Sequence, residues 1–370
     1  MKEKTRAISL FAAIILVLVL AGCGGGGGSS SGGAGVGEVQ AVGLHGSPNE
    51  EYYQLNFVTG VEYWFPVYEG FKQAGNLLGV KTFYTGCTEY DANAEVAVFE
   101  QTLAKNPKGI FLSPITAEAF KEPVDRAIAQ GVAIVTMASD SPESKRNGYI
   151  TSDNVKEGQH AARAIGNALG GRGKVMTLRN PGQTNHDIRI DTFIATMKAE
   201  FPNIQLVADL PSNQDVDKAY QAVMTVAQRH PDLGAVWMPE ANSASGASRA
   251  AVELGGGKAK ILIICADVNE QILDMLQTGD MFGAINPDQG MQGFFGMLML
   301  FMAAHPELVD PMNGKKAMGL NPTFIPYCDN GLNLVTGQNA QYFYVDKYAQ
   351  SLGYSSIQDM LGPGTGVPRK

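Results

Sequence analysis

The chain has 370 residues, of which 45% are apolar and 17% are charged, as in a globular protein. Its 28 basic and 36 acidic residues give a formal net charge of −8, and the sequence has no cluster of Lys or Arg. This balance excludes binding of nucleic acid through a basic surface, and the length suffices for two domains of ordinary size.

The first segment of the chain has the pattern of an export signal. Three basic residues before position 7 precede an apolar run over residues 8–20. A membrane-spanning helix needs about 20 apolar residues, so this run is too short to cross a bilayer. A cleaved signal peptide over residues 1–22 therefore fits better than a membrane span.

The end of this segment, Leu20-Ala21-Gly22-Cys23, resembles the bacterial lipobox. The resemblance implies that Cys23 is acylated and becomes the mature N-terminus. The alternative is an ordinary signal peptide that ends near a cysteine by chance. Against it, residues 23–50 begin with an almost pure Gly/Ser stretch, which is typical of a flexible tether. We expect a lipid-anchored chain whose body lies in the periplasm or on the outer cell surface.

The other three cysteines, Cys87, Cys265 and Cys328, show no spacing that is typical of a metal site. Cys265 ends an apolar run and is expected in a packed strand. A Cys87–Cys328 disulfide stays open as an alternative in an oxidising compartment. We expect neither a metal nor a cofactor.

From residue 53 onward, short strand-like runs alternate with helical stretches. Apolar residues at spacings of three or four, such as Val96, Phe99 and Leu103, give the helices one buried face. The alternation predicts a parallel sheet covered by helices. The expected strands cover 54–58, 82–84, 109–112 and 133–137, and the expected helices cover 64–78, 92–105 and 117–130.

The same alternation restarts after residue 154. It predicts a helix over 158–169 and strands over 174–178, 205–208, 234–238 and 261–265. A long apolar helix over 289–304 and a strand over 331–336 follow, in a tail too short for a third domain. The predicted fold class is therefore α/β, with two doubly wound, Rossmann-like parallel-sheet domains.

The predicted domains exchange chain segments. The N-terminal α/β domain is expected over 51–152 and 287–325, and the C-terminal α/β domain over 153–286 and 326–340. A C-terminal tail is expected over 341–370. The hinge between the domains is expected at three crossovers, near 152–154, 266–267 and 286–288.

The segments that follow the expected strands are rich in carboxylates, amides and aromatic rings. In open parallel sheets, ligands bind beyond the carboxyl ends of the strands. Aromatic faces can stack on the flat side of a sugar while carboxylates and amides bond to its hydroxyls. This composition favours a sugar or polyol as the ligand.

The order and spacing of several short motifs resemble the ribose-type periplasmic binding proteins, which are the solute-binding subunits of ABC importers. The resemblance covers roughly residues 52–340 and implies the type I fold of that family, with hinge closure on a small ligand. Residues 85–91, 136–140 and 238–242 are most similar to the branch that binds autoinducer-2 and rhamnose. The motifs are Tyr63-Trp64-Phe65, Ser152-Asp153-Asn154, Arg189-Ile190-Asp191, Asp267 and Asn286-Pro287.

Position after a strand and the family resemblance together imply a set of ligand-binding residues. Tyr63 and Trp64 are expected to stack on a sugar ring, and Asp267 is expected to accept hydrogen bonds from two hydroxyls. The whole set is Tyr63, Trp64, Ser139, Asp140, Asn185, Asp187, Arg189, Glu240, Asn242, Asp267 and Asn286.

Structural alternatives stay open for these residues. Trp64 could belong to the core, and Asp267 could cap the helix that follows it. Glu240 and Asn242 stand in a loop that opens a helix, so either could cap it as well. Asp187 and Arg189 could pair with one another.

Some positions depart from the ribose-type pattern. The arginine of the fifth loop falls on Asp187, the asparagine of the next loop falls on Glu240, and the glutamine at the third crossover falls on Asn286. The pattern therefore does not name the solute.

Signatures of enzymes are missing from the sequence. Residues 170–174 lack the first glycine of a phosphate-binding loop, and no Gly-x-Ser-x-Gly elbow occurs outside the Gly/Ser-rich tether. We expect a monomeric binding protein that delivers a sugar or polyol to the membrane subunits of an ABC permease. The alternative is the binding subunit of a sensory, chemotaxis or quorum-sensing system of the autoinducer-2 type. A repressor of the same fold would need a helix-turn-helix where this chain has its signal segment.

Overall fold

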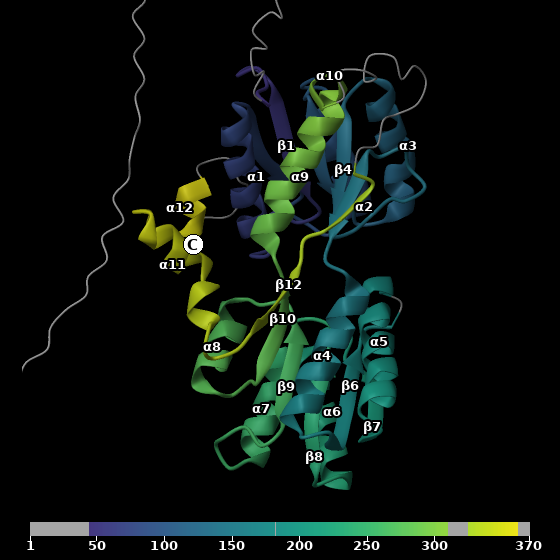
Figure 1. Ribbon diagram of the computed structural model, residues 1–370, viewed down its shortest axis with the longest axis vertical. Coiled ribbons are helices and arrows are strands. Elements are labelled where there is room, and N and C mark those ends of the chain that lie inside the picture. The colour runs from purple at the N-terminus through teal and green to yellow at the C-terminus, as the bar shows by residue number, and fades with distance from the viewer. Residues whose placement is uncertain (1–43, 182, 310–324, 362–370) are drawn as a thin grey trace, which may run out of the picture. The chain divides into compact units, whose positions relative to one another are not determined.

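Two sheets, each flanked by helices, carry the described part of the chain (Figure 1). This computed structural model describes residues 44–181, 183–309 and 325–361. The expected signal peptide, the acylation site Cys23 and the tether up to residue 43 lie outside the described residues. No helix within them is long and apolar enough to span a bilayer.

The first sheet has the strand order β11-β5-β4-β3-β1-β2, and all its neighbouring strands are parallel. Its central strands β3 and β4 are buried along their whole length, as expected where helices cover both faces of a parallel sheet. The strands are β1 (Glu51–Asn56), β2 (Lys81–Gly86), β3 (Gly109–Ser113), β4 (Ala133–Met137), β5 (Gly148–Thr151) and β11 (Tyr327–Asp329). The helices packed around this sheet are α1 (Trp64–Leu78), α2 (Ala92–Leu103), α3 (Ala117–Ala129) and α9 (Gln289–Ala304).

The second sheet has the order β12-β10-β9-β8-β6-β7, and its edge strand β12 runs antiparallel to β10. The strands are β6 (Arg172–Arg179), β7 (Asn203–Pro211), β8 (Leu233–Met238), β9 (Leu262–Ala266), β10 (Gly283–Pro287) and β12 (Leu332–Val335). The helices are α4 (Asn154–Ala168), α5 (Thr184–Glu200), α6 (Val216–Arg229), α7 (Ala244–Leu254) and α8 (Glu270–Thr278). The predicted α/β class with two parallel-dominated sheets is confirmed.

The chain passes from one sheet to the other at three places, which are β5 to α4, β10 to α9, and β11 to β12. Asp153 and Asp288 fix the first two passages, because each accepts a hydrogen bond from the first turn of the helix that follows. The expected crossover at 266–267 is wrong, because β9 and β10 are neighbours in one sheet and α8 connects them. The third crossover lies between Asp329 and Leu332, because β11 still pairs with β5 of the first sheet.

Two glycines allow α1 and α9 to approach closely. A Cβ on Gly293 would lie 1.7 Å from the carbonyl oxygen of Val67, and a Cβ on Gly70 would lie 2.0 Å from that of Gly290. Because of this close packing, the start of α9 lies beside α1 and brings residues of the second crossover to the residues that precede α1.

The C-terminal segment, defined as residues 340–361, is helical rather than a simple tail. It contains a 3-10 turn (Ala340–Tyr342), α11 (Val345–Ser351) and α12 (Ile357–Leu361) (Figure 1). Ala340 and Tyr344 pack into a core of the second sheet, whereas Ala349, Ile357 and Met360 pack into a core of the first sheet. The C-terminal segment therefore contacts the helices of both sheets.

Candidate functional site

Arg189 is the buried centre of the polar residues at the carboxyl end of the second sheet. Its side chain is 8% exposed, its Nε donates to Asn154 Oδ1 at 2.9 Å, and its Nη1 donates to the carbonyl of Pro239 at 2.8 Å. Its Nε also lies 2.9 Å from a carboxylate oxygen of Glu157, which is fully buried. Arg189 thus ties α4, α5 and the end of β8 together.

Asp267 follows β9 with a left-handed backbone, at φ +64°. Its carboxylate is 27% exposed, and its Oδ2 lies 4.0 Å from Arg189 Nη1. Burial raises the pKa of Asp267, and the Arg189 guanidinium opposes that rise. The cap of α8 is Asn269, whose Oδ1 accepts from the N–H of Ile272 at 2.9 Å. Asp267 therefore does not cap α8, and its carboxylate is available to a ligand.

Tyr63, which comes from the part of the chain that forms the first sheet, lies near Asp267. It stands immediately before α1, and its hydroxyl donates to Gln292 Oε1 of α9 at 3.0 Å. Burial and the negative charge of Asp267 raise the pKa of Tyr63 above its usual range, while the charge of Arg189 opposes the rise. Tyr63, Arg189 and Asp267 are thus close enough to interact electrostatically, although they come from distant parts of the chain.

Trp64 is only 2% exposed and packs as a core residue of the first sheet. Its indole makes edge contacts with Phe57 and Tyr63, at ring distances of 5.2 and 4.8 Å. The indole N–H is buried and has no hydrogen-bond partner among the described residues. Stacking of Trp64 on a ligand remains a prediction.

Asp140 lies in a network that the sequence did not reveal. It accepts hydrogen bonds from Thr136 Oγ1 at 2.6 Å and from Arg146, whose Nη2 lies at 2.6 Å. The Arg146 guanidinium also lies over the ring of Tyr149, 5.6 Å from its centroid. Burial raises the pKa of Tyr149 to about 12, and the charge of Asp140 adds to the effect. The neighbouring Ser139 is half-buried.

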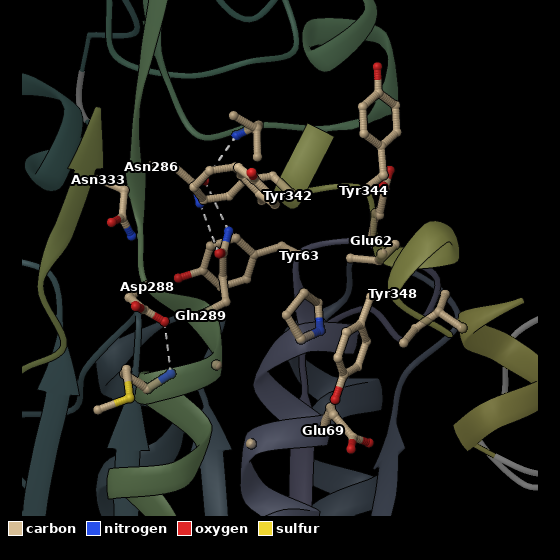
Figure 2. Close-up of a pocket in the computed structure, with 18 of the residues that line it drawn as sticks. Glu62, Tyr63, Glu69, Asn286, Asp288, Gln289, Asn333, Tyr342, Tyr344 and Tyr348 are labelled. Carbon is tan, nitrogen blue, oxygen red and sulfur yellow. Dashed lines mark hydrogen bonds between the residues drawn. The ribbon is translucent and has the colours of Figure 1, made fainter. Parts of the chain in front are cut away.

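Asn286 is 1% exposed at the end of β10, and its amide is fully engaged. Its Oδ1 accepts from the N–H of Val268 at 3.1 Å, and its Nδ2 donates to Gln289 Oε1 at 3.0 Å (Figure 2). Asn286 therefore links β10 to the junction of β9 and α8, which is the junction that carries Asp267.

Glu240 and Asn242 both have partners near the start of α7. Glu240 is 4% exposed and accepts hydrogen bonds from the backbone N–H of Ser243, at 3.0 Å, and from its hydroxyl. Burial raises the pKa of Glu240. Asn242 is exposed and donates to Gln214 Oε1 at 2.8 Å. The bonds of Glu240 serve the turn that opens α7.

Asn185 and Asp187 lie at the start of α5. Asn185 is exposed, and Asp187 pairs with Arg179 at 3.3 Å rather than with Arg189. Arg179 also pairs with Asp209 at 2.8 Å, so it joins β6, β7 and α5. Sequence spacing gave no signal for Arg179, because its partners are brought together only by the pairing of the strands.

The remaining chemical expectations concern cysteines and metals. Cys87, Cys265 and Cys328 are all free, so the Cys87–Cys328 disulfide is not formed. Among the described residues, no group of three or more His, Cys, Asp or Glu side chains could hold a metal ion.

A cavity of about 400 Å³ lies beside these residues but is not their cleft. Of the predicted site residues, only Tyr63 and Asn286 line it (Figure 2). Its other walls come from α1, the junction of β9 and α8, the start of α9 and the C-terminal segment.

Comparison with known proteins identifies the family. Residues 54–306, which are more than half of the chain, match the periplasmic binding protein domain, and the chain belongs to this family. It is 25% identical over 261 residues to the D-allose-binding periplasmic protein of Escherichia coli (strain K12). The aligned residues cover 68% of this chain and 83% of that protein. It is 27% identical over 208 residues to the ribose import binding protein RbsB of Bacillus subtilis (strain 168), covering 55% of this chain and 65% of the relative.

Two solved structures support the same assignment. AraP, an arabinose-binding protein from Geobacillus stearothermophilus, has a TM-score of 0.74 and 30% identity, covering 80% of this chain and 100% of AraP. A sugar-binding protein of a sugar ABC transporter from Bacillus halodurans has a TM-score of 0.74 and 29% identity. The expected ribose-type periplasmic binding protein with the type I fold is confirmed, and it is a substrate-binding protein rather than an enzyme. These relatives do not single out the autoinducer-2/rhamnose branch.

Proposed function

We propose that this chain is the lipid-anchored solute-binding component of an ABC importer and binds a small neutral sugar or polyol. The observation that carries the proposal is the Asp267 carboxylate, which lies free of hydrogen bonds from described residues beside the buried Arg189. The names of its relatives, which bind allose, ribose and arabinose, support a sugar as the ligand.

The chemistry of this pair suits hydroxyl groups. A carboxylate can accept from two adjacent hydroxyls, and a guanidinium can donate to the same oxygens. The two opposite charges lie close together, so the pair needs no net charge on the ligand. Tyr63 adds an aromatic wall from the first sheet, against which the apolar face of a sugar ring can pack.

Closure of the two sheets on the ligand is the expected conformational step. The three passages between the sheets are short, and the first two begin at capped helices, so they can serve as hinges. A ligand that contacts Tyr63 from one side and Asp267 from the other gains contacts in the closed state. Binding would therefore favour closure.

Attachment through acylated Cys23 rests on the sequence, where the lipobox-like motif precedes the Gly/Ser-rich tether. The test is phase partition of the expressed protein in a detergent that separates on warming. We expect the wild-type chain in the detergent phase and the Cys23→Ala chain in the aqueous phase. Equal partition of the two would contradict the anchor.

The ligand is tested by isothermal titration with L-arabinose, D-ribose, D-allose, D-xylose and xylitol. We expect saturable binding of at least one of them with one site per chain. The matched control is Asp232→Asn, the same substitution at an exposed carboxylate that precedes β8 and pairs with Lys174. A sugar that loses affinity in Asp267→Asn but not in Asp232→Asn supports the proposed site.

A further inference from the structure

The cavity of about 400 Å³ beside the predicted sugar site has walls from several distant segments. They are α1, the junction of β9 and α8, the start of α9, and the C-terminal segment (Figure 2). The bond from the Tyr344 hydroxyl to Asp274 Oδ1, at 2.6 Å, holds one end of the C-terminal segment on α8. The bond from Lys72 Nζ to the carbonyl of Met360, at 3.3 Å, holds its other end on α1. The cavity is thus a built feature of the fold.

The lining of this cavity combines aromatic rings and carboxylates with amide and aliphatic side chains. Within the described part of the chain, no Lys, Arg or His side chain lines it. The carboxylates are those of Glu62, Glu69 and Asp288, and the aromatic rings are those of Tyr63, Phe294, Tyr342, Phe343, Tyr344 and Tyr348. A lining of this kind carries negative charge and offers electron-rich ring faces.

Glu69 is the carboxylate with the clearest need for a further partner. Its Oε1 accepts from Gln73 Nε2 at 3.0 Å, and the same amide donates to the Tyr348 hydroxyl at 3.2 Å. Its Oε2 is buried and has no hydrogen-bond partner among the described residues. Figure 2 shows Glu69 and the hydroxyl end of Tyr348 at the same end of the cavity. A buried carboxylate oxygen without a partner is costly, so a bound cation or donor would stabilise it.

Asp288 adds a second negative charge at the opposite wall. Its Oδ1 accepts from the N–H of Met291 at 3.0 Å, as the cap of α9. The ion pairs formed among the described residues include neither Asp288 nor Glu69. No described Lys or Arg side chain forms an ion pair with Glu69 or Asp288. Lys347 Nζ lies over the ring of Tyr344, 3.5 Å from its centroid, so that ring already has a cation on one face.

We propose that this cavity is a second ligand site, which adjoins the sugar site at Tyr63 and Asn286, and that it binds a small organic cation. Ring faces attract ammonium groups by cation–π interaction, and the carboxylates supply the opposite charge. A bare metal ion would leave most of the volume unfilled and gain nothing from the rings. A neutral sugar would leave the carboxylates without a counter-charge, whereas a quaternary or primary ammonium satisfies both features.

The probes are choline and putrescine, and the control is 3,3-dimethyl-1-butanol, which has the shape of choline without its charge. Binding to the whole protein is measured by isothermal titration. We expect one cation to bind at least tenfold more tightly than the neutral alcohol. The proposal is overturned if neither cation binds more tightly than the alcohol, or if neither binds at roughly 10 mM.

Variants then locate the site. Glu69→Gln should weaken cation binding at least fivefold, whereas Glu122→Gln, an exposed carboxylate of α3 outside the cavity, should leave it unchanged. Asp267→Asn should also leave cation binding unchanged, because Asp267 does not line the cavity. Thermal melting confirms that each variant is folded. Unchanged cation binding in Glu69→Gln, or its loss in Asp267→Asn, overturns the assignment while leaving the proposed sugar function testable by itself.

Discussion

The Arg189 guanidinium lies 4.0 Å from the Asp267 carboxylate, with Nη1 facing Oδ2. This distance is too long for a hydrogen bond, so the two groups are neighbours without saturating each other. One ligand hydroxyl can accept from the arginine and donate to the aspartate at the same time. The pair forms because α5 and the end of β9 meet at the carboxyl edge of the second sheet, although 78 positions separate the residues in the chain.

The first prediction concerns the role of Asp267 in binding. Asp267→Asn should weaken binding of the cognate sugar at least tenfold, about 1.4 kcal/mol, because the amide cannot accept from two hydroxyls with a full charge. Asparagine is preferred over alanine here, because the backbone at φ +64° suits Asn and strains most other residues. The unliganded melting temperature should stay nearly constant. A large drop in that temperature would assign Asp267 a structural role instead.

The second prediction is that Arg189, unlike Asp267, stabilises the unliganded fold. Arg189→Met should lower the free energy of unfolding by about 3–5 kcal/mol, because it removes two hydrogen bonds from a charged donor and leaves their acceptors, Asn154 Oδ1 and the carbonyl of Pro239, without this partner. Urea unfolding of the unliganded protein measures the loss. The control is Arg163→Ala, which removes an exposed pair with Glu200 and should leave the free energy of unfolding nearly unchanged. Similar losses in the two variants would mean that Arg189 is not a structural anchor.

The third prediction is a pH dependence caused by Glu95. This side chain is fully buried, its Oε2 accepts from the N–H of Ile115 at 2.8 Å, and burial raises its pKa to about 8. Between roughly pH 5 and 8, the folded protein keeps this proton and the unfolded chain has lost it. The free energy of unfolding contributed by Glu95 therefore falls as pH rises through this window.

Glu95→Gln should remove that contribution, because the amide oxygen can still accept from Ile115 and does not titrate. Melting temperatures of wild type and variant are compared at pH 5 and pH 8. Burial also raises the pKa of Glu157 to about 8, so the wild-type slope has a second source, and the difference between the two proteins isolates Glu95. Parallel slopes in wild type and variant would refute the prediction.

The fourth prediction tests the attachment of the C-terminal segment. Tyr344→Phe removes the hydrogen bond to Asp274 and should lower the free energy of unfolding by about 1 kcal/mol. Tyr342→Phe is the matched control, because its ring is 79% exposed and lies two residues away. We expect no measurable change from this control. If both variants unfold like wild type, the bond to α8 does not hold the segment in place.

The best-predicted helices and strands were those with a strong apolar pattern and with residues at both ends that mark where the element begins and stops. The helix over 64–78, the strand over 133–137 and the helix over 289–304 have the expected bounds. The strand β5 was missed, because four residues give little local signal even where Tyr149, Ile150 and Thr151 favour a strand. The helices of the C-terminal segment were missed as well, since each is too short to show a periodic apolar face.

The candidate site was predictable only in part. Asp267 was identified because it directly follows an apolar strand, and Arg189 because it belongs to a motif of the family. The partners of Asp140 and Asp187 were not predicted, because Arg146 and Arg179 meet them through the folded chain. The place of a residue directly after a strand predicts that it lies at the edge of the sheet. Its hydrogen-bond partners cannot be predicted in this way, because they depend on how neighbouring strands and helices pack.

The proposed function depends most directly on sugar binding at Asp267. Isothermal titration of the purified protein and of Asp267→Asn against L-arabinose, D-ribose, D-allose, D-xylose and xylitol measures it. We expect at least one of these ligands to bind wild type with a dissociation constant of about 1 μM or below, and to bind Asp267→Asn at least tenfold more weakly. Absence of binding by the whole panel, or equal affinity of the two proteins, would contradict it.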